Sequence, residues 1–148
     1  MSNWERELSQ WLPHFRTVVY HGAQGERARM REELRGGGAF DVLLTTYTYF
    51  EREACGPDRA FLRSMQFVVM ALDEAHSLKN AGSDRYRRLL RIPFERRVLL
   101  TGTPINNSLP ELLCLLQVSA MRCGRAAAAR AARPGLGCPC CVCADTVL

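Results

Sequence analysis

Short apolar segments that alternate with helical patterns constrain the fold of this chain more than any other feature. Residues 41–47 and 67–72 are mostly apolar along their whole length, which is typical of strands buried on both faces. Shorter strands are predicted at residues 17–20 and 97–100. Strands of this kind that alternate with helices build a mostly parallel sheet covered by helices. The sequence therefore predicts an α/β fold.

Helices are predicted between and around these strands, at residues 2–12, 24–35, 58–65 and 83–91 and from about 109 to 116. Ser2 and Glu5 have the spacing of a capping box, which satisfies two backbone donors at a helix start. Ser83 is expected to cap the fourth helix in a similar position. Each helix carries an apolar stripe that can pack on the sheet.

The second predicted helix carries three arginines on one face, because Arg27, Arg31 and Arg35 recur at four-residue intervals. This face could bind phosphate, but we expect a solvated outer surface, which is the commoner role of such a stripe. Met30 and Leu34 are expected to point inward.

The last 31 residues differ in composition from the rest of the chain. Residues 118–148 contain eight Ala, five of the seven Cys and no aromatic residue, and helical periodicity is lost. We expect a domain over residues 1–117 and an unstructured, low-complexity Ala/Arg/Cys tail over 118–148. Four Cys between residues 138 and 143 could bind zinc or copper(I), but structural zinc sites separate their ligand pairs more widely. A metal site in the tail is therefore not favoured.

Charge and hydropathy exclude some functions and leave others open. The net charge of +5 permits nucleic-acid binding without showing it. The longest strongly apolar stretch, residues 67–72, is far below the roughly 20 residues that a bilayer crossing needs. The N-terminus is polar, with no apolar stretch typical of a secretory signal. We therefore expect an intracellular protein that does not enter the membrane.

Polar side chains follow two of the predicted strands at the point where each strand ends. Asp73, Glu74 and His76 come after strand 67–72, and residues 101–103 (Thr-Gly-Thr) follow strand 97–100. In parallel sheets these ends meet at one edge, where ligands bind. Asp73 can hold Mg²⁺, and Glu74 can orient or deprotonate a water that attacks a γ-phosphate. This arrangement predicts a nucleotide site.

Two ordered motifs resemble a known family. Residues 73–80, Asp-Glu-Ala-His-Ser-Leu-Lys-Asn, resemble the second helicase motif of SWI/SNF-type ATPases, and residues 99–107 resemble the third. Residues 41–47 look like the family's strand and DNA-contact motif between the first two motifs. Trp4-Glu5 with Trp11 resembles the helix that follows motif Ia of the family. The resemblance covers residues 3–117. Two shorter patterns, at residues 20–22 and 82–86, favour the SMARCAD-type subfamily of chromatin remodellers.

The resemblance implies a partial RecA-like lobe of an ATP-driven translocase on double-stranded DNA that moves nucleosomes in the nucleus. The cofactors implied are ATP and Mg²⁺. Asp73 would hold Mg²⁺, and Glu74 would activate water. Coupling between the nucleotide site and DNA binding would be carried by His76, Thr101, Gly102 and Thr103. Thr45 and Thr46 would lie near the DNA backbone, where a hydroxyl can bond a phosphate oxygen.

Parts of the family pattern are not found in these 148 residues. The phosphate loop, Gly-x-x-x-x-Gly-Lys-Ser/Thr, is absent, and Lys79 is the only lysine. The second lobe with its arginine finger is absent too, so we expect this chain alone to lack ATPase activity. The alternative is an inactive interaction module that binds DNA or a protein partner. The resemblance also implies a missing strand at the centre of the sheet, which would leave strand edges uncovered.

Overall fold

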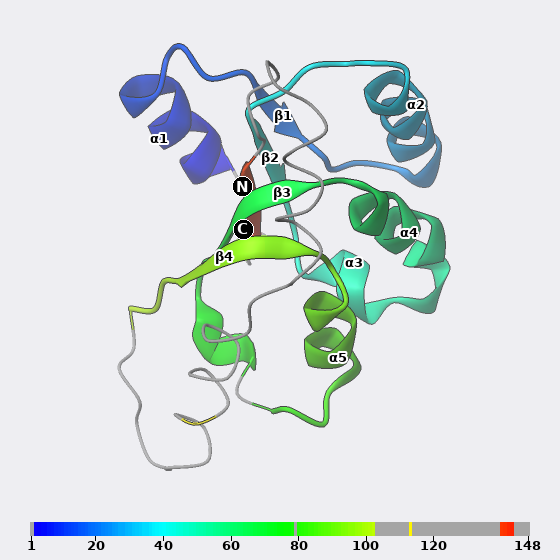
Figure 1. Ribbon diagram of the computed structural model, residues 1–148, viewed down its shortest axis with the longest axis vertical. Coiled ribbons are helices and arrows are strands. Elements are labelled where there is room, and N and C mark those ends of the chain that lie inside the picture. The colour runs from blue at the N-terminus through cyan, green and yellow to red at the C-terminus, as the bar shows by residue number, and fades with distance from the viewer. Residues whose placement is uncertain (1, 79, 103–112, 114–139, 144–148) are drawn as a thin grey trace.

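The computed structural model describes residues 2–78, 80–102, 113 and 140–143. Its sheet has five strands, β1 (Thr17–Val19), β2 (Val42–Thr45), β3 (Phe67–Leu72), β4 (Phe94–Leu99) and β5 (Cys140–Cys143). The helices are α1 (Ser2–Trp11), α2 (Gln24–Arg35), α3 (Thr48–Glu51), α4 (Gly56–Ser64) and α5 (Asp84–Leu90), with 3₁₀ turns η1 (Glu53–Cys55) and η2 (Ala75–Leu78). Every strand pairing is parallel, in the order β1-β2-β5-β3-β4 (Figure 1), as the sequence predicts for an α/β fold.

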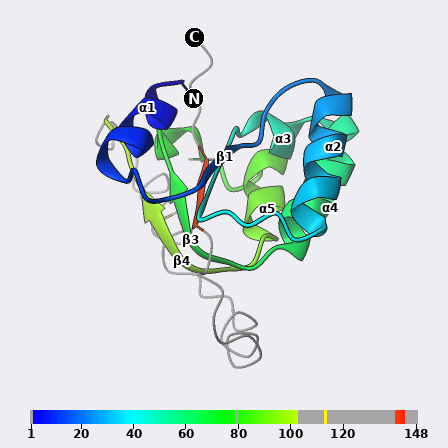
Figure 2. The same cartoon turned by 90° about the horizontal axis from the view of Figure 1, so that it is seen from above.

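Helices cover both faces of the sheet. Figure 2 shows α1 on one face and α2, α3, α4 and α5 on the other. Successive side chains of a strand point to opposite faces, so β2 contributes to two apolar clusters. Leu43 belongs to the larger cluster, whereas Val42 and Leu44 form the smaller one with Leu8 of α1. The continuous apolar pattern of β2 is therefore explained by burial on both sides.

The starts of α2 and α5 follow from local capping. The backbone N–H of Ala23 donates to Glu26 Oε2 at 2.7 Å, which satisfies a donor at the start of α2. The Ser83 hydroxyl accepts from the Tyr86 backbone N–H at 3.2 Å, so the predicted cap of α5 is confirmed. Gly37, with φ +108°, lies just after α2, in a conformation that favours glycine.

Strand β4 is longer than the sequence predicts. It begins at Phe94, three residues before the expected start at Arg97. Phe94 is buried and pairs in register with Phe67 of β3, and the two rings stack with their centroids 5.2 Å apart. The single Phe94 between charged and Pro residues gave too short an apolar pattern to reveal this pairing.

The predicted tail contributes four residues, Cys140–Cys143, to the sheet of the domain. This segment is β5, and it lies between β2 and β3 in the middle of the sheet. Cys141 stands opposite Leu43 of β2 and Met70 of β3 in the register of the sheet. The edges of β2 and β3 that we expected to be uncovered are therefore paired through β5.

Some expectations fall on residues that the structure does not describe. They concern the helix from about 109 to 116, Lys79, Thr103 and the rest of the tail. Within the described part of the chain, no helix is both long enough and apolar enough to cross a membrane. The same residues contain no group of three or more His, Cys, Asp or Glu side chains placed to hold a metal ion.

Candidate nucleotide site at the ends of β3 and β4

The carboxyl ends of β3 and β4 bring two of the predicted polar segments together. Just after the last paired residues of β3 and β4, the Leu100 backbone N–H donates to Leu72 O at 2.8 Å, and the Ala75 backbone N–H donates to Leu100 O at 2.9 Å. These two bonds hold the start of η2 against the end of β4. Thr101 and Gly102, which follow Leu100, are exposed next to this junction. The predicted meeting of the two segments at one edge of the sheet is therefore found.

Asp73 is held by bonds on each side-chain oxygen. Its Oδ2 accepts from the Trp4 indole Nε1–H at 2.7 Å, and its Oδ1 accepts from the Glu74 backbone N–H at 2.9 Å. The Tyr47 hydroxyl also donates to the Asp73 backbone carbonyl at 2.9 Å. The side chain is partly buried. The carboxylate thus has a fixed position at the end of β3.

Glu74 has an unusual backbone conformation. Its φ is +48°, and it is the only non-glycine residue with positive φ among the described residues. This conformation turns the chain sharply after β3 and leaves the Glu74 side chain 45% exposed. Its Oε2 lies 3.1 Å from Nδ1 of His76, whose side chain is 48% exposed. A carboxylate in this position can reach a solvent water.

The donor chemistry of this edge fits a magnesium–nucleotide complex. A carboxylate has about four lone-pair sites, so Asp73 keeps about two after its two hydrogen bonds. Mg²⁺ is usually bound through one or two carboxylates together with substrate phosphates and waters. Asp73, with Glu74 beside it, matches that requirement. A bare ion site made only of protein ligands does not fit the described residues, which contain no cluster of three such groups.

Thr45 and Thr46 lie deeper in the structure than their expected role suggests. The Thr45 side chain is fully buried, and its hydroxyl donates to Tyr20 O at 3.2 Å. Thr46 is 2% exposed, and its hydroxyl lies 3.2 Å from that of Thr48. Contact with a phosphate would require the end of β2 to be uncovered. The DNA role of both residues stays a prediction.

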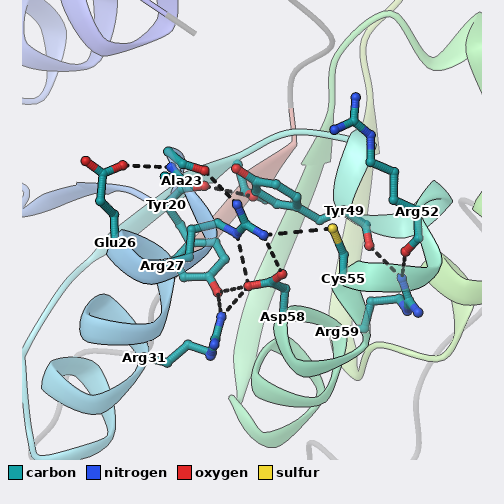
Figure 3. Close-up of polar contacts among 12 residues, drawn as sticks. Tyr20, Ala23, Glu26, Arg27, Arg31, Tyr49, Arg52, Cys55, Asp58 and Arg59 are labelled. Carbon is teal, nitrogen blue, oxygen red and sulfur yellow. Dashed lines mark hydrogen bonds and ion pairs between the residues drawn. The ribbon is translucent and has the colours of Figure 1, made fainter.

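A buried ionic cluster that the sequence analysis missed lies between α2 and α4 (Figure 3), on the face of the sheet opposite α1. Asp58 of α4 is 1% exposed and accepts hydrogen bonds from the Tyr20 hydroxyl, Arg27 and Arg31. The bond from Arg27 Nη2 to Asp58 Oδ2 measures 3.1 Å. The expected solvated face of Arg27 and Arg31 is therefore wrong, because both side chains turn inward to one carboxylate.

The Asp58 cluster shifts the titration of its members. Burial alone would raise the pKa of Asp58, but the hydrogen bonds from Arg27 and Tyr20 and the charges of Arg27 and Arg31 outweigh it and lower the pKa. Burial raises the pKa of the Tyr20 hydroxyl, and its bond to Asp58 raises it further. Asp58 is thus ionised at neutral pH, and Tyr20 acts as a donor to it.

Two further arginines, Arg59 and Arg35, make contacts near the Asp58 cluster. Arg59, which is 8% exposed, donates to Tyr49 O at 3.0 Å and to Arg52 O at 2.6 Å. These carbonyls lie at the end of α3, where the last helical carbonyls lack partners within the helix. The guanidinium of Arg35 lies over the Phe61 ring at 5.7 Å. The acceptors of Arg59 lie 10 and 7 positions before it in the sequence, in a separate helix and directly after that helix, so the periodicity of one helix gave no signal for these contacts.

Comparison with known proteins gives a family match. The sequence model of the family described as "SNF2-related domain" matches residues 1–126. The chain is 47% identical over 118 residues to the mouse (Mus musculus) chromodomain-helicase-DNA-binding protein 1-like, covering 80% of this chain and 13% of that protein. It is 43% identical over 118 residues to a Drosophila melanogaster protein named as a SWI/SNF-related, matrix-associated, actin-dependent regulator of chromatin, subfamily A containing DEAD/H box 1 homolog, covering 78% and 14%.

A solved structure has the same fold. The Sulfolobus solfataricus SWI2/SNF2 ATPase core in complex with dsDNA matches with a TM-score of 0.65 and 28% identity, over 81% of this chain and 23% of that one. The partial RecA-like lobe predicted from the motifs is thereby confirmed. The chain spans only about an eighth of the length of the two curated relatives. They carry names of different remodelling proteins, so the SMARCAD-type leaning stays a prediction.

Proposed function

Because the chain belongs to the SNF2-related domain family, we propose that it is part of the first lobe of an ATP-driven translocase that moves along double-stranded DNA and acts on nucleosomes in the nucleus. The observation that supports this most is the edge of the sheet where Asp73 and Glu74 follow β3. There the Ala75 N–H bond to Leu100 O joins the carboxylates to the segment after β4. Chemistry in parallel sheets gathers at such an edge.

The two carboxylates have different surroundings, which suits two different roles. Asp73 is partly buried and fixed by Trp4 and by the Glu74 amide, so it is suited to hold Mg²⁺ at a set position. Glu74 is half exposed, so it is suited to orient or deprotonate the attacking water. When bound, Mg²⁺–ATP supplies the phosphoryl group and an ion that neutralises developing charge.

His76 and the segment after β4 are proposed to couple the nucleotide to DNA. His76 lies 3.1 Å from Glu74, so a change around that carboxylate reaches the imidazole directly. Thr101 and Gly102 are exposed beside the same junction, and Thr103 follows them in the sequence. Thr45 and Thr46 are kept as proposed DNA contacts at the end of β2. Movement at the site could reach them through Tyr47, which bonds the Asp73 carbonyl.

The test places this segment in a protein that also contains the phosphate loop and second lobe of the family. Glu74→Gln should reduce DNA-stimulated ATP turnover by at least about 100-fold while nucleotide binding stays unchanged, because Glu74 acts on the water and not on the bound ground state. Glu33→Gln, on the exposed surface of α2, is the matched control and should keep normal turnover.

The outcomes separate the proposed function from its alternative. Near-normal turnover in Glu74→Gln would show that Glu74 is not the base. If the unmodified protein binds DNA without DNA-stimulated turnover, the inactive interaction module is the better description. We expect the 148-residue chain by itself to show no turnover, because its sequence lacks the phosphate loop, which supplies a lysine and backbone amides to the phosphates.

A further inference from the structure

The indole of Trp4 reaches a carboxylate that lies 69 positions further along the chain. Its Nε1–H donates to Asp73 Oδ2 at 2.7 Å, a short and charge-assisted bond. We propose that Trp4 is a positioning residue, which fixes the Asp73 carboxylate for a divalent cation and links α1 to the nucleotide site. The proposal rests on the role of Asp73 given above and adds a residue outside the strand-end motifs.

Packing supports the placement of Trp4. Its ring is partly buried against the smaller apolar cluster, which contains Leu8, Val42 and Leu44. Leu8 lies one turn after Trp4 on the same face of α1, so the helix is anchored to the sheet by both side chains. The indole is therefore held from two sides, by apolar contacts along its ring and by Asp73 at its nitrogen.

The second tryptophan of the chain shows the contrast. Trp11 also donates its indole N–H to a carboxylate, at 3.0 Å, but the acceptor is Glu7 on the same helix. Trp11 is 71% exposed, so its bond is a local contact on the surface of α1. Of these two indole bonds, the one from Trp4 crosses from α1 to the end of β3, whereas the one from Trp11 stays within α1. Trp11 is therefore a matched internal control for the role of Trp4.

The bond has a direct consequence for cation binding. With Oδ2 held by Trp4 and Oδ1 by the Glu74 amide, the carboxylate cannot rotate freely about its Cβ–Cγ bond. Hydrogen-bond partners of ligating carboxylates orient the ligand, and their loss typically weakens metal binding by about 10- to 100-fold. Replacing the indole by an aromatic ring without an N–H should therefore weaken the binding of a cation at Asp73, while the ring still packs against the smaller apolar cluster.

The first test uses the indole N–H signals of the 148-residue chain in NMR spectra. The chain has two tryptophans, so Trp11→Phe identifies the Trp4 signal. Asp73→Asn should shift the Trp4 signal and speed its exchange with water, while the Trp11 signal stays in place. Glu7→Gln should do the reverse. A Trp4 signal that ignores Asp73→Asn would overturn the proposal.

The second test titrates the chain with Mn²⁺, a paramagnetic ion that accepts the same oxygen ligands as Mg²⁺. Broadening of the Glu74 amide signal reports the ion at Asp73. We expect Trp4→Phe to raise the midpoint of this broadening about 10-fold and Trp11→Phe to leave it unchanged. Equal midpoints in the two variants would refute the positioning role. If the Asp73→Asn variant shows the same broadening as the unsubstituted chain, Asp73 does not bind the cation. That outcome would contradict the proposed function and not the positioning role of Trp4.

Discussion

Replacing Asp58 with Asn tests the buried ionic cluster without changing its volume. The substitution removes the negative charge that faces both Arg27 and Arg31. It leaves the buried guanidinium of Arg27 and the partly buried guanidinium of Arg31 without this counter-charge. It also places an amide N–H₂ among donors, because Tyr20, Arg27 and Arg31 all donate to this side chain. Both effects should destabilise the folded state.

The size of the loss follows from burial. The side chains of Asp58 and Arg27 are 2% and 9% exposed, so water cannot replace the lost partner. Breaking a buried ion pair by removing one partner costs about 3–5 kcal/mol. Domains are stable by only about 5–15 kcal/mol, so Asp58→Asn should remove a large share of the free energy of unfolding. With a urea slope of about 2 kcal/mol per molar, the midpoint should fall by about 1.5–2.5 M.

The assay is urea unfolding at pH 7, followed by circular dichroism, with Asp84→Asn as the matched control. Asp84 also pairs with two arginines, Arg87 and Arg88, but its side chain is 54% exposed. A pair this open to water contributes at most about 1 kcal/mol. If Asp58→Asn and Asp84→Asn shift the midpoint equally, the buried cluster does not have the energetic role argued here.

Acid should reduce the difference between the unsubstituted chain and Asp58→Asn. Because the pKa of Asp58 is lowered in the folded state, its stabilising contribution is present above its unfolded pKa of about 4. That contribution is lost as the pH falls through the folded pKa. The gap between the two urea midpoints should therefore be constant above about pH 5 and narrow below pH 4. A gap that stays constant down to pH 2 would contradict the assignment of a lowered pKa.

Further predictions concern backbone strain, the central strand and a surface ion pair. Glu74→Gly should raise the free energy of unfolding by about 0.5–1 kcal/mol, because glycine adopts φ +48° without the penalty that other residues pay; Glu74→Ala should not, and thermal melting compares the two. Val142→Pro should lower the melting temperature strongly because it removes a backbone donor from β5 between Leu44 and Ala71, whereas Val142→Thr keeps that donor and should have a small effect. Hydrogen bonds from Arg16 lower the pKa of Asp41 to about 2, so its contribution should be present above about pH 4 and lost towards pH 2; chemical-shift titration of Asp41 with and without Arg16→Gln measures this.

The sequence predicted the features that depend on local patterns. The strand at residues 67–72 has the bounds that its apolar run predicts, and α2 begins and ends where the pattern places it. Capping chemistry acts over three or four residues, so Ser83 could be assigned from its neighbours alone. The meeting of the two strand ends was predictable because parallel strands place all their carboxyl ends at one edge.

The features that the sequence did not predict depend on partners distant in the chain. Arg27 and Arg31 have the spacing of a solvated helix face, and only the fold shows that Asp58 lies opposite them. The bond from Trp4 to Asp73 was missed for the same reason, since neither the helical pattern around Trp4 nor the family resemblance indicated its partner. A single sequence specifies which residues can be buried, but not which distant residue each of them meets.

The central strand β5 shows this limit most clearly. Parallel neighbours are joined by long crossovers and not by a tight turn, so no local signal marks a parallel partner. Between β2 and β3, any short extended segment can complete both ladders if its backbone donors are free, and Cys-Cys-Val-Cys meets that requirement. The composition of this segment predicted an unstructured tail, and nothing in it indicated a strand. Pairing on two sides satisfies more backbone groups per residue than an edge strand does. Four residues from a segment with the composition of a tail can therefore form part of the sheet's centre.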